Sequence, residues 1–274
     1  MLSLIGIAPH PPIIIPAIGG NRLNEAQQTV DGIKQLGSLI KEAAPELLII
    51  ITPHGQVLRE GPAVHTGDLL VGDFGQFGAP GIKIKFQTDQ KLVQLLEEEA
   101  RAELLRPVFL RNGNGLFHSR QQLDHGAMVP LYYLQEAGVN VPGLHITYGY
   151  NPYRQLYQFG KALKRAVDKR GAPVAVIASG DLSHRLIPGA PASYNPRGAE
   201  FDRLLVELLR KGRVEDILEF DPQLVEAAGE CGLRSFIIAL GMFDGEDFAT
   251  DIISYEGPFG VGYLVAALNV ESND

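Results

Sequence analysis

The chain has 274 residues, of which 45% are hydrophobic, and it carries a formal net charge of -8 at pH 7. Its length and apolar content favour one large domain over residues 1–274. We expect no nucleic-acid or membrane partner, because an acidic surface attracts neither phosphates nor anionic headgroups and no stretch is long enough to span a bilayer. The single cysteine, Cys231, excludes an internal disulfide and, without a signal-peptide pattern, predicts a cytoplasmic protein.

Short apolar runs alternate with longer amphipathic segments along the chain. In chain order, the pattern predicts a strand at 2–8, a helix at about 22–43, a strand at 47–52, a helix at 88–103, a strand at 139–149, a helix at 154–171, a strand at 172–180, then two helices, and strands at 249–257 and 260–268. This alternation favours an α/β fold with a largely parallel central sheet.

Local signals refine two parts of this pattern. Thr88 and Asp89 form a cap typical of a helix start, and Gly171 follows basic residues in the manner of a helix end. The glycine-rich stretch 67–81 is too long and irregular to be a simple connection. Loops of that length usually carry function, so we expect this stretch to cover or line a site.

Three histidines follow predicted strands: His10, His54 and His184. Ligand crevices open at strand ends in an α/β sheet, so these positions predict a metal or acid/base site. Prolines on both sides of His10, and Pro53 before His54, stiffen the backbone that presents each ring. A single histidine of this kind would be a strand-end side chain bonded to a carbonyl, but two together favour metal ligands.

A catalytic metal needs a third protein donor, and two adjacent residues compete for that role. Glu230 follows Gly229, which ends one predicted helix, and it would begin the next helix, where the dipole favours an ionised carboxylate. Its alternative is an ordinary first-turn glutamate. Cys231 could serve as a thiolate at the same helix start, although a buried inert thiol is the commoner role. Because one residue turns a helix by about 100°, only one of the two should face the metal, and we favour Glu230.

Other polar side chains have two possible roles each. Asp181 could orient the ring of His184, or bond its own backbone in a turn. Arg234 could bind a substrate carboxylate as a bidentate fork, or form a structural salt bridge. His118 is close enough in sequence to His125 to line the same pocket. Three further side chains are not expected in the site: His65, His145 and Tyr263.

An ordered set of motifs covers nearly the whole chain: APHPP near the start, TPHG after the second strand, LDHGAMVPL at 123–131, SGDLSHRL at 179–186, GECGLRSF at 229–236 and GPFGVGYLV at 257–265. Together they resemble the LigB-like class III extradiol ring-cleavage dioxygenase superfamily. The resemblance implies a mixed sheet flanked by helices, with ferrous iron held at the sheet edge by His10, His54 and Glu230. It also implies that His184 is the second-sphere acid/base and that His125 is a substrate-pocket histidine.

The implied reaction is ring opening of a catechol-type aromatic diol by dioxygen. Two histidines and one carboxylate leave three adjacent positions on the metal open, enough for a diol and dioxygen side by side. Some relatives have a separate small helical subunit over the pocket, so such a subunit, like a homo-oligomer, is a possible partner. In Memo-like relatives a cysteine replaces the glutamate, so a metal-binding or redox accessory protein without ring cleavage is the alternative. A zinc-dependent hydrolase is also open, since the same donors bind zinc.

Overall fold

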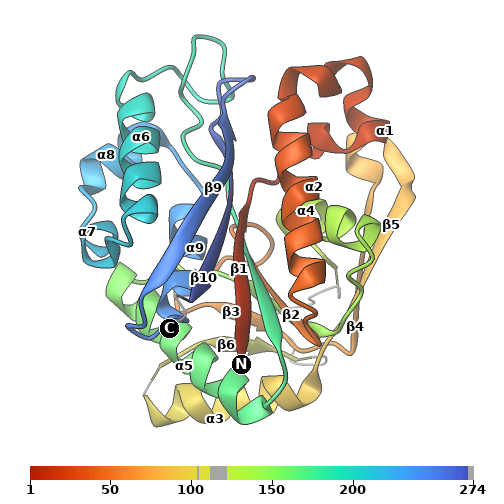
Figure 1. The fold of residues 1–274 in the computed structure, drawn as a ribbon, viewed down its shortest axis with the longest axis vertical. Helices are drawn as coiled ribbons and strands as arrows, with labels where there is room; N and C mark the ends of the chain where they lie inside the picture. The colour runs from red at the N-terminus through yellow and green to blue at the C-terminus, as the bar shows by residue number, and fades with distance from the viewer. Residues whose placement is uncertain (104, 112–121, 271–274) are drawn as a thin grey trace.

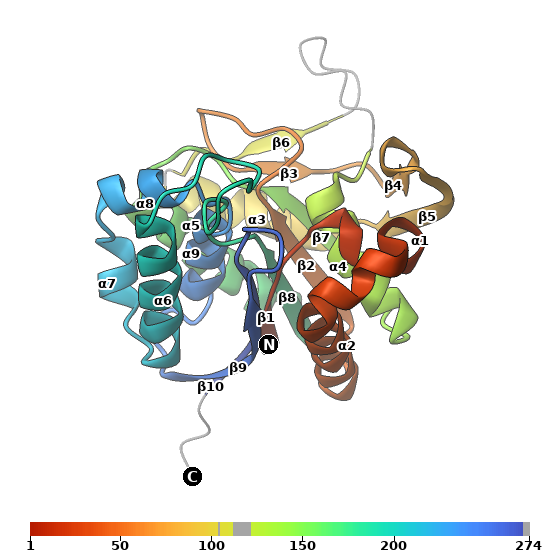
Figure 2. The ribbon, with the colours of Figure 1, turned by 90° about the horizontal axis from the view of Figure 1, so that it is seen from above.

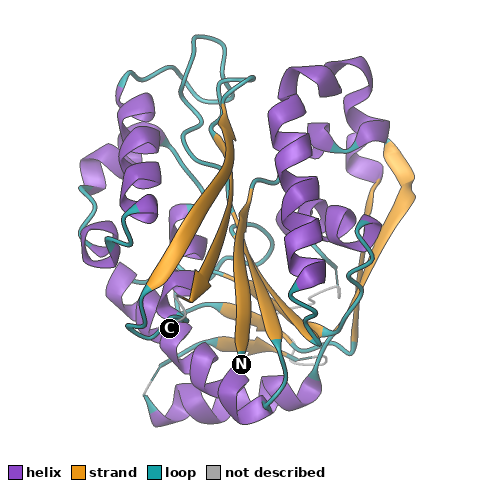
Figure 3. Ribbon diagram, in the orientation of Figure 1, coloured by secondary structure: helices purple, strands orange, loops and turns teal. Residues whose placement is uncertain are grey.

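An eight-stranded mixed sheet runs through the protein and carries helices on both faces (Figures 1 and 3). The structure is a computed structural model that describes residues 1–103, 105–111 and 122–270. The strands of this sheet are β1 Leu2–Ala8, β2 Leu47–Thr52, β3 Ala63–His65, β6 Val108–Leu110, β7 Gly143–Thr147, β8 Val174–Ser179, β9 Phe248–Glu256 and β10 Tyr263–Val270. The α/β fold with a central mixed sheet, predicted above, is confirmed.

The strands lie in the order β6-β3-β7-β2-β8-β1-β10-β9. The four central strands, β7, β2, β8 and β1, are parallel and almost entirely buried. Continuous apolar runs suit such strands, because helices cover both of their faces. Toward the edges, β10, β9 and β3 are each antiparallel to a neighbour. Since parallel strands end at the same edge, the carboxyl ends of the four central strands lie side by side.

Helices α3, α5 and α9 pack on one face of the sheet, and α2 and α4 pack on the other (Figures 1 and 2). The α-helices are α1 Pro16–Gly19, α2 Gln27–Glu42, α3 Gln90–Ala102, α4 His125–Glu136, α5 Tyr153–Arg170, α6 Arg197–Arg210, α7 Val214–Leu218, α8 Pro222–Ala228 and α9 Leu233–Gly241. Short 3-10 segments span Pro12–Ile14, Gly20–Ala26 and Gly75–Phe77. Among the described residues, no helix is both long and apolar enough to cross a membrane.

The glycine-rich stretch 67–81 is part of a β-hairpin, so the expectation of an irregular loop was wrong. β4 Leu69–Phe74 pairs antiparallel with β5 Ala79–Gln87, and a 3-10 turn joins them. Residues on the two strands are buried in alternation, and the buried ones pack against α4. Gly72 lies so close to Met128 of α4 that a Cβ would clash with its sulfur. The glycine therefore serves close packing of the hairpin.

Of three helix boundaries predicted from local signals or periodicity, the start of α3 and the end of α5 are confirmed. Asp89 caps α3 by accepting a hydrogen bond from the Leu92 N–H at 2.6 Å. Gly171 ends α5 with φ 74°, a left-handed conformation that suits glycine. The helix expected at 22–43 is shorter than predicted, because a 3-10 segment precedes α2. Periodicity alone does not separate these two helical forms.

Replacing Asp89 by alanine is expected to lower the free energy of unfolding by about 1–2 kcal/mol, because Asp89 caps α3 and binds Arg170 at 3.0 Å. Partial burial raises the pKa of Asp89, but hydrogen bonds from Arg170 and from the Leu92 N–H outweigh it and leave the pKa lowered. This contribution is therefore present above a pH of about 4 and is lost as the pH falls further.

Urea unfolding at neutral and acidic pH measures this loss. The exposed Asp168, which pairs with Lys164, provides a control, since Asp168→Ala should change stability by less than about 0.5 kcal/mol. A loss for Asp89→Ala of the same size at both pH values would contradict the assignment.

Candidate metal centre

The strands that carry the predicted site are neighbours in the sheet. β8 lies between β1 and β2, so its last residue, Ser179, sits between the loops that follow the other two strands. His10 is the second residue after β1, and His54 is the second residue after β2. Because all three strands are parallel, these loops leave the sheet at one edge.

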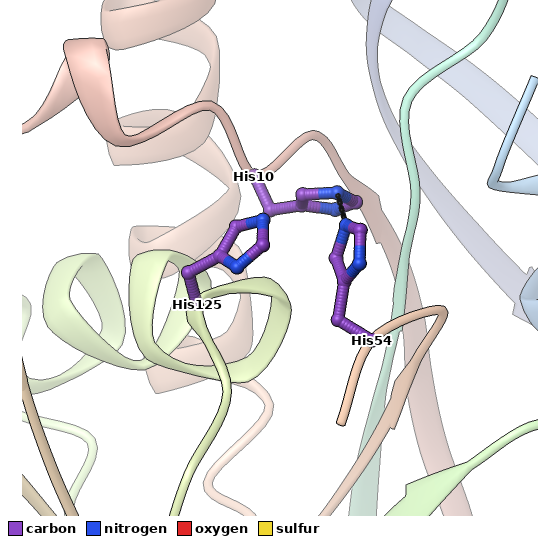
Figure 4. A group of neighbouring side chains, drawn as sticks. All are labelled: His10, His54 and His125. Carbon is purple, nitrogen blue, oxygen red and sulfur yellow. Dashed lines mark hydrogen bonds between the residues drawn. The ribbon is translucent and has the colours of Figure 1, made fainter. Parts of the chain in front are cut away.

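His10, His54 and His125 converge at this edge (Figure 4). The Nε2 atoms of His10 and His54 face each other at 3.0 Å, with the two rings at 88°. His125 is the first residue of α4, and its ring lies 4.1 Å from the ring of His54 and 5.5 Å from that of His10. The ligand atoms of all three lie within 4.8 Å of one another, a spacing that could hold a metal ion.

The protonation state of the histidine pair suits a cation. Burial, the largest cause, and nearby histidines lower the pKa of both His10 and His54 to about 3, so both rings are neutral at neutral pH. Neutral imidazole is the form that binds a metal. The two Nε2 atoms, 3.0 Å apart, are close enough to bind one metal ion together.

Ser179 sets the orientation of the His10 ring. Its hydroxyl donates to the carbonyl of Gly126 at 2.6 Å and lies 3.0 Å from His10 Nδ1. With its proton committed to Gly126, the hydroxyl oxygen accepts the Nδ1 proton, which leaves the lone pair of His10 on Nε2. The His10 backbone N–H also donates to Asp181 Oδ1 at 3.0 Å. His10 is thus held with its free nitrogen toward His54.

Ser179→Ala is expected to weaken metal binding by roughly 10- to 100-fold, because the Nδ1 proton of His10 then has no acceptor and the ring is free to turn. Anaerobic titration with ferrous iron measures the affinity. Ser183→Ala is the matched control, since Ser183 Oγ bonds Ala228 O in the loop that carries His184 and touches neither ligand. Unchanged affinity in Ser179→Ala would mean that the hydroxyl does not orient the ligand.

The two candidates for the third ligand point to different places. Cys231 Sγ lies 3.7 Å from His10 Nε2 and 3.8 Å from His184 Nε2, and it groups with His10 and Asp181 as a possible metal site. The Glu230 carboxylate accepts a hydrogen bond from the Leu233 N–H at 2.6 Å, at the start of α9. Among the described residues, Glu230 belongs to neither group of possible metal ligands.

Burial raises the pKa of both side chains, that of Glu230 to about 7. Glu230 therefore has the helix-terminal contact that the sequence offered as its alternative role, and Cys231 faces the histidines. The identity of the third ligand stays a prediction.

His184 lies beside Cys231 on a loop that is tied down by backbone contacts. Its N–H donates to Ala228 O at 3.1 Å, and the N–H of Ser183 donates to the buried Asp202 carboxylate at 2.8 Å. Burial lowers the pKa of His184, so its ring is neutral at neutral pH. No hydrogen bond joins Asp181 to the His184 ring in the part of the chain that the structure describes. Asp181 instead accepts the backbone N–H of His10, which neither of its predicted roles included.

A buried polar network behind the histidines was missed by the sequence analysis. The carboxylate of Asp124, which caps α4, accepts from Thr52 Oγ1 at 2.7 Å and from His145 Nε2 at 3.0 Å. Thr52 in turn accepts the backbone N–H of His54 at 3.2 Å. Burial alone would raise the pKa of Asp124, but these hydrogen bonds hold it well below its usual range. The ring of His65 stacks on that of His145, with 4.2 Å between the ring centres.

The remaining predicted residues have mixed outcomes. Tyr263 is buried in β10, as expected for a core side chain. His118 lies outside the described residues, so its role stays a prediction. Among the described residues, no carboxylate lies within ion-pairing distance of Arg234, so the expected salt bridge is absent. Its guanidinium lies instead among three tyrosine rings: Tyr148, Tyr150 and Tyr153.

Comparison with known proteins agrees with the resemblance of the motifs. Residues 5–266 match the family described as the catalytic LigB subunit of aromatic ring-opening dioxygenase. The crystal structure of uncharacterized protein JW3007 from Escherichia coli K12 is similar in fold, with a TM-score of 0.65 and 14% identity, over 97% of this chain and 99% of that one.

Proteins of related sequence include two named dioxygenases. Protein CA_C1420 of Clostridium acetobutylicum is 37% identical over all of this chain, which spans 59% of that protein's length. The 2-aminophenol 1,6-dioxygenase beta subunit of a Pseudomonas species is 26% identical over 96% of this chain and 92% of its own. The 3,4-dihydroxyphenylacetate 2,3-dioxygenase of Escherichia coli is 23% identical over 87% of this chain and 88% of its own. Since the family match covers nearly all of the sequence, the chain belongs to the LigB family of aromatic ring-opening dioxygenase subunits.

Proposed function

We propose that the protein is a non-haem, ferrous-iron-dependent extradiol dioxygenase that opens the ring of a catechol-type aromatic with dioxygen. The observation that carries the proposal is the pair of neutral imidazoles, His10 and His54, whose Nε2 atoms face each other at 3.0 Å. Two relatives named as dioxygenases, one for an aminophenol and one for a dihydroxyphenyl acid, support the substrate class.

In this proposal His10 and His54 hold the metal, with Cys231 or Glu230 as the third protein ligand. The ionised form of either third ligand carries one negative charge, so a divalent ion keeps a net positive charge in both cases. When bound, ferrous iron supplies a Lewis acid for the diol and redox chemistry for dioxygen. Zinc is the alternative metal, because the same donors bind it.

Other side chains of the site then handle protons and exclude water. The neutral ring of His184 can accept a proton from a diol hydroxyl and return it later in the reaction. His125 faces the ring of His54 and can donate a hydrogen bond to the second diol oxygen. Phe77, from the turn of the β4–β5 hairpin, lies with its ring 5.5 Å from that of His125 and can shield that ring from water.

Oxygen uptake tests this function. Protein loaded anaerobically with ferrous iron is mixed with air-saturated buffer and a panel of catechols, and oxygen and the absorbance of ring-opened products are followed. We expect uptake with at least one diol. Zinc-loaded protein is the control, because zinc has no redox chemistry. If iron-loaded protein consumes no oxygen with any diol, the proposal fails.

A second candidate function is a Memo-like metal-binding or redox accessory protein without ring cleavage. The position of Cys231 favours it, because the thiol and not the Glu230 carboxylate lies against the ring nitrogen of His10. This function predicts that the metal is retained through Cys231 while no diol is consumed. The oxygen-uptake experiment therefore separates the two candidates.

Partners and location also stand as proposals. The diol and dioxygen are the small-molecule partners, and the cysteine content favours a cytoplasmic location. The edge strand β9 offers backbone groups for a homo-oligomer. A separate small helical subunit could cover the pocket, and one relative is itself named as a beta subunit. Light scattering of the purified chain gives its oligomeric state directly.

A further inference from the structure

The loop that carries His184 is held by hydrogen bonds from three other parts of the fold. The N–H of Gly262, just before β10, donates to the carbonyl of Ser183 at 2.8 Å. The His184 N–H donates to the carbonyl of Ala228, the last residue of α8, at 3.1 Å. The third contact comes from α6, where Asp202 Oδ1 accepts the Ser183 N–H at 2.8 Å.

Asp202 differs from the other two partners because it bonds the loop through its side chain. Among the described residues, no other side chain from outside the loop bonds the backbone of residues 182–184. Asp202 is only 1% exposed, and its Oδ2 accepts the hydroxyl of Tyr255 on β9 at 2.7 Å. α6 packs against β9, which brings these two side chains together (Figure 1).

The surroundings of Asp202 fix its carboxylate in place. A Cβ on Gly262 would overlap Asp202 Oδ2, so the start of β10 lies directly against this oxygen. Burial raises the pKa of Asp202 to about 6, and the hydrogen bonds from Tyr255 and from the Ser183 N–H offset burial only in part. The carboxylate is therefore ionised at neutral pH, and an ionised acceptor strengthens its bond to the Ser183 N–H.

The position of the His184 ring depends on this contact. His184 directly follows Ser183, and its Nε2 lies 3.8 Å from Cys231 Sγ beside the metal centre. Without Asp202, the buried Ser183 N–H would lack an acceptor, so the loop would shift toward another partner. A misplacement of about 1 Å in a reacting group can lower a rate about 10²-fold.

We propose that Asp202 is a positioning residue, which holds the loop so that the His184 ring can take a proton from a bound diol. This inference rests on the proposed function, because it concerns the base of that reaction. Asp202 acts only through the backbone of Ser183. Its loss should therefore impair proton transfer, while the iron bound per chain stays the same.

The absorbance of 4-nitrocatechol tests this role without oxygen, because the absorbance changes when the diol loses its second proton. Ferrous-loaded protein is mixed with this diol anaerobically. We expect the wild type to bind it as the dianion. Asp202→Ala should bind it mainly as the monoanion, like His184→Gln, which gives the spectrum expected without the base.

Two further variants distinguish positioning from a general loss of stability. Asp202→Asn should restore the dianion, because its amide oxygen can accept the Ser183 N–H and its amide nitrogen can donate to the Tyr255 hydroxyl. Tyr255→Phe is the matched control, since it removes the other hydrogen bond of the carboxylate and keeps the contact with Ser183. We expect this variant to be less stable than the wild type and to bind the dianion.

Oxygen uptake gives a second measurement of the same effect. With a diol that the wild type consumes, kcat of Asp202→Ala should fall roughly 10- to 100-fold, while KM changes little. Asp202→Asn should recover most of this loss.

The outcomes separate this inference from the proposed function. A dianion bound by Asp202→Ala or by His184→Gln overturns it, as does failure of the wild type to bind 4-nitrocatechol. Equal losses in Asp202→Ala and Tyr255→Phe also overturn it. A dianion that is lost in Asp202→Ala and restored in Asp202→Asn, without oxygen uptake by the wild type, supports positioning and contradicts ring cleavage. If Asp202→Ala does not fold, Asp202→Ser decides in the same way, because its hydroxyl is too short to reach Ser183.

Discussion

Replacing either His10 or His54 by alanine is expected to abolish binding of ferrous iron and, with it, oxygen uptake. Each ring supplies one of the two nitrogens that face each other at 3.0 Å, so removal of either ring leaves one nitrogen of the pair. The loss of affinity should exceed the roughly 10- to 100-fold that removal of a supporting partner costs. Metal analysis after anaerobic loading and desalting measures the iron retained per chain.

His184→Gln is the matched control for this prediction. His184 lies near the same sulfur as His10 but takes no part in the pair, so the variant should retain iron while its oxygen uptake falls. Loss of a general base typically costs about 10²- to 10⁴-fold in rate. Full iron occupancy in His10→Ala or His54→Ala would contradict their assignment as ligands.

The second large effect concerns the two residues that compete as third ligand. From the positions of the side chains, Cys231→Ser is expected to lose most of its iron, whereas Glu230→Gln is expected to keep it. The sulfur lies against the nitrogen of His10, and the Glu230 carboxylate is held at the start of α9 by the Leu233 N–H. Iron retained per chain and unfolding temperature are measured together for both variants.

Both substitutions nearly preserve the shape of the side chain, so a difference in retained iron reports the loss of a ligand and not a packing defect. The amide oxygen of Gln can still accept the Leu233 N–H, and Ser differs from Cys by one atom. The opposite result, with iron lost in Glu230→Gln and kept in Cys231→Ser, would mean that Glu230 is the third ligand, as the sequence predicted.

The strand ends that carry the site could be predicted from the sequence. β1 and β2 are continuous apolar runs followed by proline and histidine, and such runs suit strands buried on both faces. The cap at Asp89 and the glycine at Gly171 were likewise sufficient to place the ends of α3 and α5. These features depend on neighbours within a few residues, which local patterns capture.

Other parts of the site depend on strand order, which local patterns do not contain. Ser179 reaches His10 because β8 lies between β1 and β2. Asp124 reaches His145 because the start of α4 lies over the end of β7, and their separation of 21 residues leaves no periodic signal. The directions of the Glu230 and Cys231 side chains could not be predicted from the sequence either. Both residues precede the first residue of α9, so the rule of 100° per residue does not apply to them.

Ring cleavage by dioxygen is tested most directly with labelled oxygen. Iron-loaded protein is given one equivalent of a catechol that it consumes under ¹⁸O₂, and the product is examined by mass spectrometry. We expect diol and oxygen to disappear in equal amounts and the ring-opened product to carry the heavy isotope. An unlabelled product, or a diol recovered unchanged after iron binding has been verified, would contradict it.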